Sequence, residues 1–171
     1  IKCASKNIFS ATWGGYGGID NYTNAISDIY QDVWQEGIFT GKGIYDLKVF
    51  STVLDNQIPE NTVLSHDLLE GSFLRCGLVT NVEVVDGFPS RFNSYIVRQN
   101  RWIRGDLQVL RWCKDKVMLN GKKVKNPLNK LSRWKILDNI RRSLIPTSLF
   151  LLILLGLTIF NIKWLYIILI F

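Results

Sequence analysis

The sequence feature that most constrains the fold is an uncharged run of 17 residues, Leu144–Phe160, near the end of the 171-residue chain. A helix needs about 20 mainly apolar residues to cross a bilayer, so this run is near the lower limit for a spanning helix. Asn161-Ile162-Lys163 interrupts the run, and a second apolar stretch follows at Trp164–Phe171. The sequence therefore predicts a transmembrane helix at 144–160 and the truncated start of a second one at 164–171, in a fragment of a longer membrane protein.

The segment just before this run predicts an amphipathic interface helix at 127–143. Its expected apolar stripe consists of Leu128, Leu131, Trp134, Leu137 and Ile140. Basic residues fill most of the other positions, a pattern typical of a helix that lies among lipid headgroups. Lys135, Arg141 and Arg142 precede the predicted span, whereas Lys163 alone follows it. By the positive-inside rule, residues 1–143 are expected to be cytoplasmic.

Charge divides the chain into two halves. Residues 1–97 carry 6 Lys and Arg against 11 Asp and Glu, and residues 98–171 carry 15 against 3, so the net charges are −5 and +12. Five lysines fall in 114–125, which the sequence predicts to be a basic loop. Such a surface attracts phosphate groups, so one hypothesis is a membrane-tethered module that binds nucleic acid or anionic lipid.

Several common sites are excluded by spacing. The three cysteines are far apart and His66 is the single histidine, so no zinc site is expected and reduced thiols fit best. Neither glycine-rich stretch, 14–18 or 37–43, completes a nucleotide-binding motif. Ser65, His66 and Asp67 contain the residue types of a hydrolase triad, but consecutive residues do not face one another.

The pattern of apolar residues predicts a mostly helical α/β domain over 1–126, with few short strands. Helices are expected at 20–36, 46–54, 65–75 and 90–112, and strands at 38–40 and 82–86. Within the last of these helices, Arg98, Arg101, Trp102 and Gly105 share one face. That face offers guanidinium groups for phosphate oxygens and an indole plane for a flat ring, although a basic helix surface with one partly covered tryptophan has the same pattern.

These segments, in their order, resemble the C-terminal half of the catalytic domain of membrane-embedded processive glycosyltransferases, the relatives of cellulose and chitin synthases. The closer resemblance is to the glucosyltransferase region of cyclic β-1,2-glucan synthases. It rests on stretches across 18–144, among them Leu64-Ser-His-Asp-Leu-Leu-Glu-Gly, Arg101-Trp-Ile-Arg-Gly-Asp and Leu131-Ser-Arg-Trp-Lys-Ile-Leu-Asp-Asn-Ile-Arg-Arg-Ser-Leu.

The resemblance implies a partial GT-A-like domain in the cytoplasmic (inner) membrane. It implies transfer of glucose from UDP-glucose to a growing β-glucan with inversion at the sugar carbon. Asp67 matches the family's general base, which takes the proton of the attacking hydroxyl. Arg98, Arg101 and Trp102 match its Gln/Arg-x-x-Arg-Trp motif, in which the arginines stabilise the departing diphosphate and the tryptophan supports the acceptor sugar.

Two departures from the family pattern limit what this chain is expected to do. The sequence has no Asp-x-Asp motif, so the donor-binding half and the ligands for Mg²⁺ or Mn²⁺ are expected outside it, and the fragment alone is expected to be inactive. His66 stands where many relatives carry Glu. A non-catalytic scaffold relative is a further alternative. No nucleic-acid partner is expected if Asp67 and Arg101 line one cleft.

Overall fold

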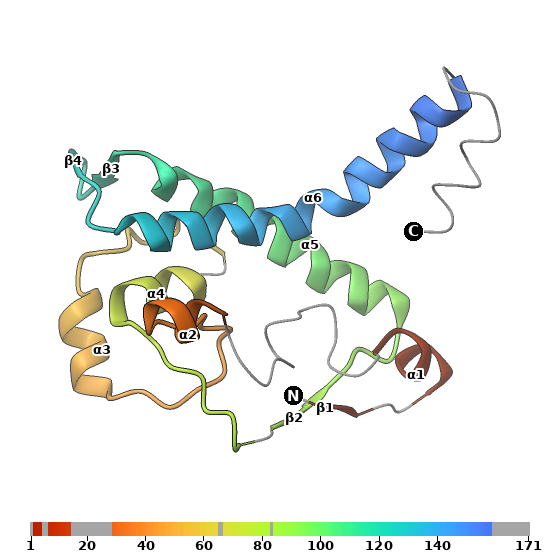
Figure 1. Ribbon diagram of the computed structural model, residues 1–171, viewed down its shortest axis with the longest axis horizontal. Coiled ribbons are helices and arrows are strands. Elements are labelled where there is room, and N and C mark those ends of the chain that lie inside the picture. The colour runs from red at the N-terminus through yellow and green to blue at the C-terminus, as the bar shows by residue number, and fades with distance from the viewer. Residues whose placement is uncertain (1, 5–6, 15–28, 65–66, 83, 159–171) are drawn as a thin grey trace.

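The computed structural model describes residues 2–4, 7–14, 29–64, 67–82 and 84–158. This part of the chain forms six α-helices and two small sheets of two strands each, and both sheets lie at the edge of the molecule (Figure 1). The helices are α1 (Ile8–Gly14), α2 (Ile29–Trp34), α3 (Leu47–Leu54), α4 (Asp67–Leu74), α5 (Phe92–Val109) and α6 (Lys130–Thr158). A 3₁₀ turn, η2 (Leu110–Cys113), extends α5. The expected mostly helical content with few strands is confirmed.

The two sheets differ in kind. β1 (Lys2–Ala4) and β2 (Val85–Gly87) pair in parallel, although they lie about 80 residues apart in sequence. β3 (Lys116–Leu119) and β4 (Lys122–Lys125) form an antiparallel hairpin. The predicted strand at 82–86 is therefore partly confirmed. The predicted strand at 38–40 is wrong, because those residues form an irregular segment that pairs with no described strand.

A compact core joins α4, α5 with η2, the hairpin and the first half of α6. Its buried residues are Leu69, Val109, Trp112, Val117, Leu128 and Ile136. Phe73 of α4 meets the Trp112 indole edge to face, with ring centroids 5.6 Å apart. These residues lie up to 67 positions apart in the sequence, so the core packs the first half of α6 against distant segments of the chain. Figure 1 shows this half of α6 crossing the domain.

Three predicted helices are found close to their expected limits. α3 begins after Asp46, whose carboxylate accepts the Val49 N–H at 2.9 Å as an N-cap. α4 and α5 lie within the predicted ranges 65–75 and 90–112. Residues 65–66 lie outside the described residues, as do residues 15–28, so α2 accounts only for the end of the helix predicted at 20–36.

The predicted basic loop at 114–125 is instead the β3–β4 hairpin. Asn120 and Gly121 form its two-residue turn with φ of 48° and 74°. Positive φ at both central positions is the requirement of a type I′ turn, and Asn-Gly is the pair that meets it most readily. The Asn-Gly pair in the sequence is typical of such a hairpin. The lysines on both sides of it favoured the prediction of a basic loop instead.

The predicted interface helix and membrane span belong to one element, α6, which is bent by 43° between 130–141 and 143–158 and contains Pro146. Within the described part of the chain, no single straight helix is long and apolar enough to cross a membrane. The two halves of α6 meet that test only as a bent pair. Residues 159–171, which include the predicted second span at 164–171, lie outside the described residues.

The first half of α6 buries a different face from the predicted stripe. Leu128 and Ile140 are buried as expected, but Trp134 and Leu137 are 57% and 48% exposed. The residues buried on the inner face, where Trp134 and Leu137 were expected, are Ile136 and the charged Lys135. This face belongs to the protein core because α4 and α5 both pack against α6.

Candidate functional site

Asp67, the predicted general base, is the first residue of α4 and is half-buried. Its carboxylate lies against the backbone of Gly41, where an added Cβ would come within 2.8 Å of Asp67 Oδ2. Gly41 also has a φ of +84°, a conformation that other residues rarely adopt. The Gly41-Lys-Gly turn therefore holds the carboxylate closely, and a carboxylate at a helix N-terminus is favoured by the helix dipole.

Residues 36–41 lead into the Gly41-Lys-Gly turn. They pack along α4 and are joined to α6 by side-chain contacts. At Gly71 of α4 an added Cβ would lie 2.5 Å from Cβ of Phe39, so only glycine permits this approach. At the far end of α4 the Gly37 N–H donates to the Cys76 carbonyl at 2.7 Å, and the Cys76 thiol donates to the Gly37 carbonyl at 3.2 Å. The segment that supports Asp67 is thus fixed along the whole length of the helix.

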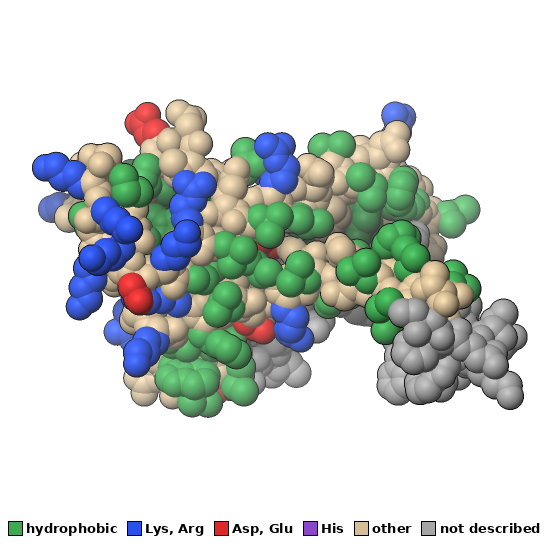
Figure 2. Space-filling view, turned by 90° about the horizontal axis from the view of Figure 1, so that it is seen from above, with side chains coloured by type: hydrophobic (Ala, Val, Ile, Leu, Met, Phe, Trp, Pro, Cys, Tyr) green, Lys and Arg blue, Asp and Glu red, His purple; other side chains and the backbone are tan. Residues whose placement is uncertain are grey.

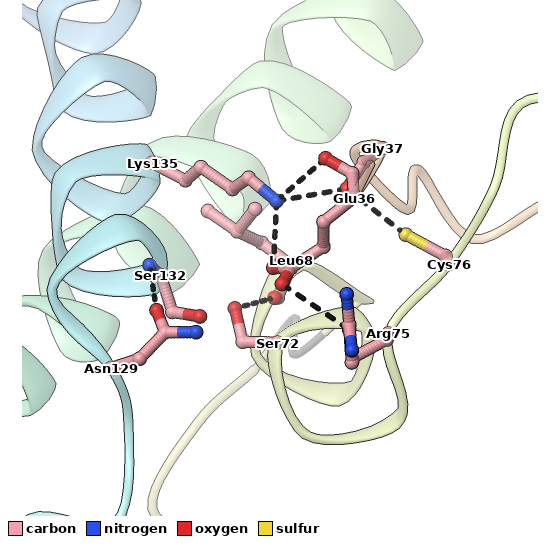
Figure 3. A network of polar contacts seen from close by, with 9 residues as sticks. All are labelled: Glu36, Gly37, Leu68, Ser72, Arg75, Cys76, Asn129, Ser132 and Lys135. Atoms are coloured by element: carbon pink, nitrogen blue, oxygen red, sulfur yellow. Dashed lines mark hydrogen bonds and ion pairs between the residues drawn. The ribbon is translucent and has the colours of Figure 1, made fainter. Parts of the chain in front are cut away.

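A buried ion pair ties this segment to α6 (Figure 3). Lys135 Nζ donates to Glu36 Oε1 at 2.8 Å and to the carbonyls of Glu36 and Gly37 at 3.1 and 3.0 Å. The Lys135 and Glu36 side chains are only 2% and 4% exposed. All three protons of the ammonium group have acceptors, which is the condition under which a charged lysine is tolerated in a core.

The predicted arginine–tryptophan face lies on α5. The Arg98 guanidinium carbon is 4.9 Å from the centroid of the Trp102 ring and 5.1 Å from that of Phe88. Both distances are within the range of cation–π attraction. Arg98 and Trp102 therefore contact each other as their spacing predicts, but the guanidinium covers one face of the indole.

Arg101 is exposed on an adjacent face of the same helix. Arg104 and Gln108 follow it at three and seven residues, so all three point to one side. The Gln108 side chain accepts the Leu64 N–H at 2.8 Å, which brings the segment just before Asp67 against the C-terminal end of this face. Arg101 lies two turns, or about 10 Å, further along the helix axis.

Asp106 was not predicted as a site residue, yet it connects α5 to α6. Its two carboxylate oxygens accept hydrogen bonds from Asn139 Nδ2 at 2.7 Å and from Ser143 Oγ at 2.6 Å. Asp106 is four residues after Trp102, so the two side chains leave α5 on the same side. The signal in the sequence was that Asp106 is the single acid between Asp86 and Asp115.

A surface depression of about 910 Å³ lies elsewhere, between the hairpin and the loop after α3. Residues that line it include Asp55, Pro59, Arg111, Lys116, Met118 and Lys123. None of the four predicted site residues lines this depression. Among the described residues no three His, Cys, Asp or Glu side chains come together in a way that could hold a metal ion.

The chain is 51% identical over 131 residues to the cyclic beta-(1,2)-glucan synthase NdvB of Rhizobium meliloti (strain 1021). The chain is a relative of one segment of a cyclic β-(1,2)-glucan synthase. The match covers 77% of this chain but only 4% of the length of that synthase. No protein-family model matches the chain.

The resemblance to cyclic β-1,2-glucan synthases inferred from the sequence is therefore confirmed. Within that relationship the structure brings two predicted site residues, Arg98 and Trp102, into direct contact. It places Asp67 on α4 and Arg101 on α5, and the N–H of Leu64, three residues before Asp67, donates to the Gln108 side chain of α5. Gly41, which lies against Asp67, and Phe88, which lies against Arg98, were not among the predicted site residues.

Proposed function

We propose that this chain is part of the glucosyltransferase region of a membrane-bound glucan synthase. In this proposal the complete protein transfers glucose from UDP-glucose to a growing β-glucan, with inversion at the sugar carbon. The match to a protein described as a cyclic beta-(1,2)-glucan synthase supports glucan synthesis as the activity. The partial GT-A-like fold and the membrane location belong to the same proposal, with α6 as the element that enters the bilayer.

Asp67 acts as the general base. A sugar hydroxyl is a poor nucleophile, so a carboxylate within hydrogen-bond distance takes its proton as the hydroxyl attacks. The observation that carries this role is the position of Asp67 at the N-terminus of α4, half-buried against Gly41. Close packing on one side leaves the carboxylate a restricted range of orientations, which suits a group that must be aimed at one hydroxyl.

The two arginines and the tryptophan take different parts in this reaction. Arg101 is exposed and is available to the diphosphate leaving group, whose developing charge a guanidinium stabilises. Arg98 lies beside the rings of Phe88 and Trp102, which fixes the plane of the indole. The remaining face of Trp102 then supports the acceptor sugar. A divalent metal, held by residues of the complete enzyme outside this segment, would supply positive charge to the diphosphate.

The test is Asp67→Asn in the full-length synthase, purified in detergent and assayed for transfer of labelled glucose into glucan. A lost general base is expected to lower kcat by about 10²–10⁴-fold with little effect on binding. Asp55→Asn is the matched control, because Asp55 is an exposed carboxylate at the end of α3 and should leave the rate unchanged. Near-normal kcat in Asp67→Asn, with normal membrane insertion, would exclude the base assignment.

A further inference from the structure

The β3–β4 hairpin carries an unusual concentration of positive charge. Lys114, Lys116, Lys122, Lys123 and Lys125 are all exposed. The hairpin register places Lys116 directly opposite Lys125, and like charges at opposed positions destabilise a strand pair. No described carboxylate forms an ion pair with any of these five ammonium groups. The nearest acid in sequence, Asp115, pairs with Arg133 of α6 at 2.7 Å.

The hairpin is held firmly despite this repulsion. Val117 is buried in the core, and Val124 and Leu119 pack against that core. At the base of the hairpin, Asn126 Nδ2 donates to the carbonyls of Trp112 and Lys114, and its Oδ1 accepts the Leu128 N–H. These bonds join the hairpin to the residues that lead into α6. The lysines are therefore kept as a fixed cationic surface whose position relative to α6 is set.

The exposed side of α6 continues from this surface. In the first half of α6, Lys130, Trp134, Leu137 and Arg141 follow one another at intervals of four, three and four, so they form one exposed stripe. Trp134, Leu137 and Leu144 are each about half exposed or more. A tryptophan and leucines between basic residues are typical of a helix side that sits in the headgroup layer.

The views of the molecule agree with a common face. In Figure 1 the hairpin lies at the upper left and the apolar second half of α6 rises at the upper right, so both lie toward the top of the view. Figure 2 views the molecule from this side, and the Lys and Arg side chains gather at its left end, where the hairpin is. Hydrophobic side chains lie in the middle and at the right of that view, and also at its lower left.

We propose that the lysine hairpin, residues 114–125, is a docking surface for anionic phospholipid headgroups. This proposal rests on the membrane location in the proposed function. When the apolar half of α6 enters the bilayer, it holds the hairpin at the level of the lipid headgroups. Charge complementarity decides the occupant, since a surface with five unpaired lysines attracts a negatively charged leaflet and gains nothing from a neutral one. The hairpin thereby sets the tilt of the domain above the membrane.

The experiment measures the accessibility of individual lysines in the full chain. The chain is reconstituted into vesicles of phosphatidylcholine, with or without 30–40% phosphatidylglycerol (about one lipid in three, enough to give a negative surface). The exposed amines are then acetylated briefly, and each lysine is quantified by mass spectrometry. Labelling of Lys122, Lys123 and Lys125 is expected to fall roughly fivefold or more in the anionic vesicles. It should recover in 0.5 M salt, because salt shortens the Debye length to about 4 Å and screens the attraction. Lys48, on α3, should be labelled equally in both.

Two variants with equal charge loss sharpen the test. Lys122→Gln/Lys125→Gln should weaken the protection of Lys123, and it removes the Lys116–Lys125 repulsion, so the hairpin stays folded. Lys48→Gln/Arg91→Gln loses the same charge at two exposed positions outside the hairpin and should leave that protection unchanged.

Equal labelling of the hairpin lysines in both vesicles would overturn the proposal. Protection by soluble polyphosphate in neutral vesicles, to the same extent as by anionic lipid, would also overturn it, because the surface would then select phosphate in solution. Neither outcome depends on Asp67, so glucan synthesis and its loss in Asp67→Asn test the proposed function separately.

Discussion

Replacing Lys135 by Met tests whether the buried ion pair is the joint between α6 and the segment behind Asp67. The methionine has a similar length but no charge, so it leaves the Glu36 carboxylate buried at 4% exposure. The remaining cation near Glu36 is Arg75, at 3.7 Å with a side chain 68% exposed. Two carbonyls, of Glu36 and Gly37, lose a donor as well.

The expected loss follows from these contacts. Breaking a buried pair by removing one partner destabilises a protein by about 3–5 kcal/mol, because an uncompensated charge stays in the core. For a domain of this size that corresponds to a fall in Tm of roughly 6–20 °C. Replacing both partners, as in Glu36→Leu/Lys135→Met, removes the charges together and should recover most of the loss.

The assay is urea unfolding in mild detergent, followed by tryptophan fluorescence, for wild type, both single variants and the double variant. The double-mutant cycle yields the coupling between the two side chains. Lys130→Met is the control, because Lys130 begins α6 but is exposed. Loss of less than about 1 kcal/mol in Lys135→Met, the value of an exposed pair, would refute the view that this pair is a buried joint.

Three further predictions follow from single contacts. Gly41→Ala should lower glucan synthesis, measured by activity, because an added Cβ would lie 2.8 Å from Asp67 Oδ2. It should also lower the free energy of unfolding by about 1–2 kcal/mol, measured in urea, because alanine rarely adopts a φ of +84°. Asp106→Ala should lower the free energy of unfolding by about 2–4 kcal/mol through loss of its hydrogen bonds to α6, whereas unchanged stability would contradict that link. Burial raises the pKa of the Cys113 thiol above 9.0, and the charge of Arg133 offsets this in part, so alkylation at pH 8 should be slower than in urea. The pKa of the Cys113 thiol is higher in the folded than in the unfolded protein, so its contribution to stability is complete below pH 9 and is lost as the pH rises further. Urea unfolding at pH 8 and at pH 10 would detect this loss.

Local patterns predicted most of the helices correctly. α3 follows its Asp46 cap, and α5 follows the run of three- and four-residue spacings that also brings Arg98 onto Trp102. Helix contacts at these spacings depend only on nearby residues, so they can be read without knowledge of the fold. The strand expected at 38–40 failed for the opposite reason. A strand needs a partner, and Phe39 instead packs on Gly71 of α4.

The sequence by itself predicted the composition of α6, rich in basic residues in its first half and uncharged from Leu144 onward. Only the tertiary structure decided which side of it faces the protein. Trp134 is more apolar than Lys135, yet Trp134 is exposed and Lys135 is buried. The reason is that Glu36 and two carbonyls, 98 and 99 residues away in sequence, supply acceptors for all three ammonium protons. Burial of a charge depends on partners that periodicity along one helix does not contain.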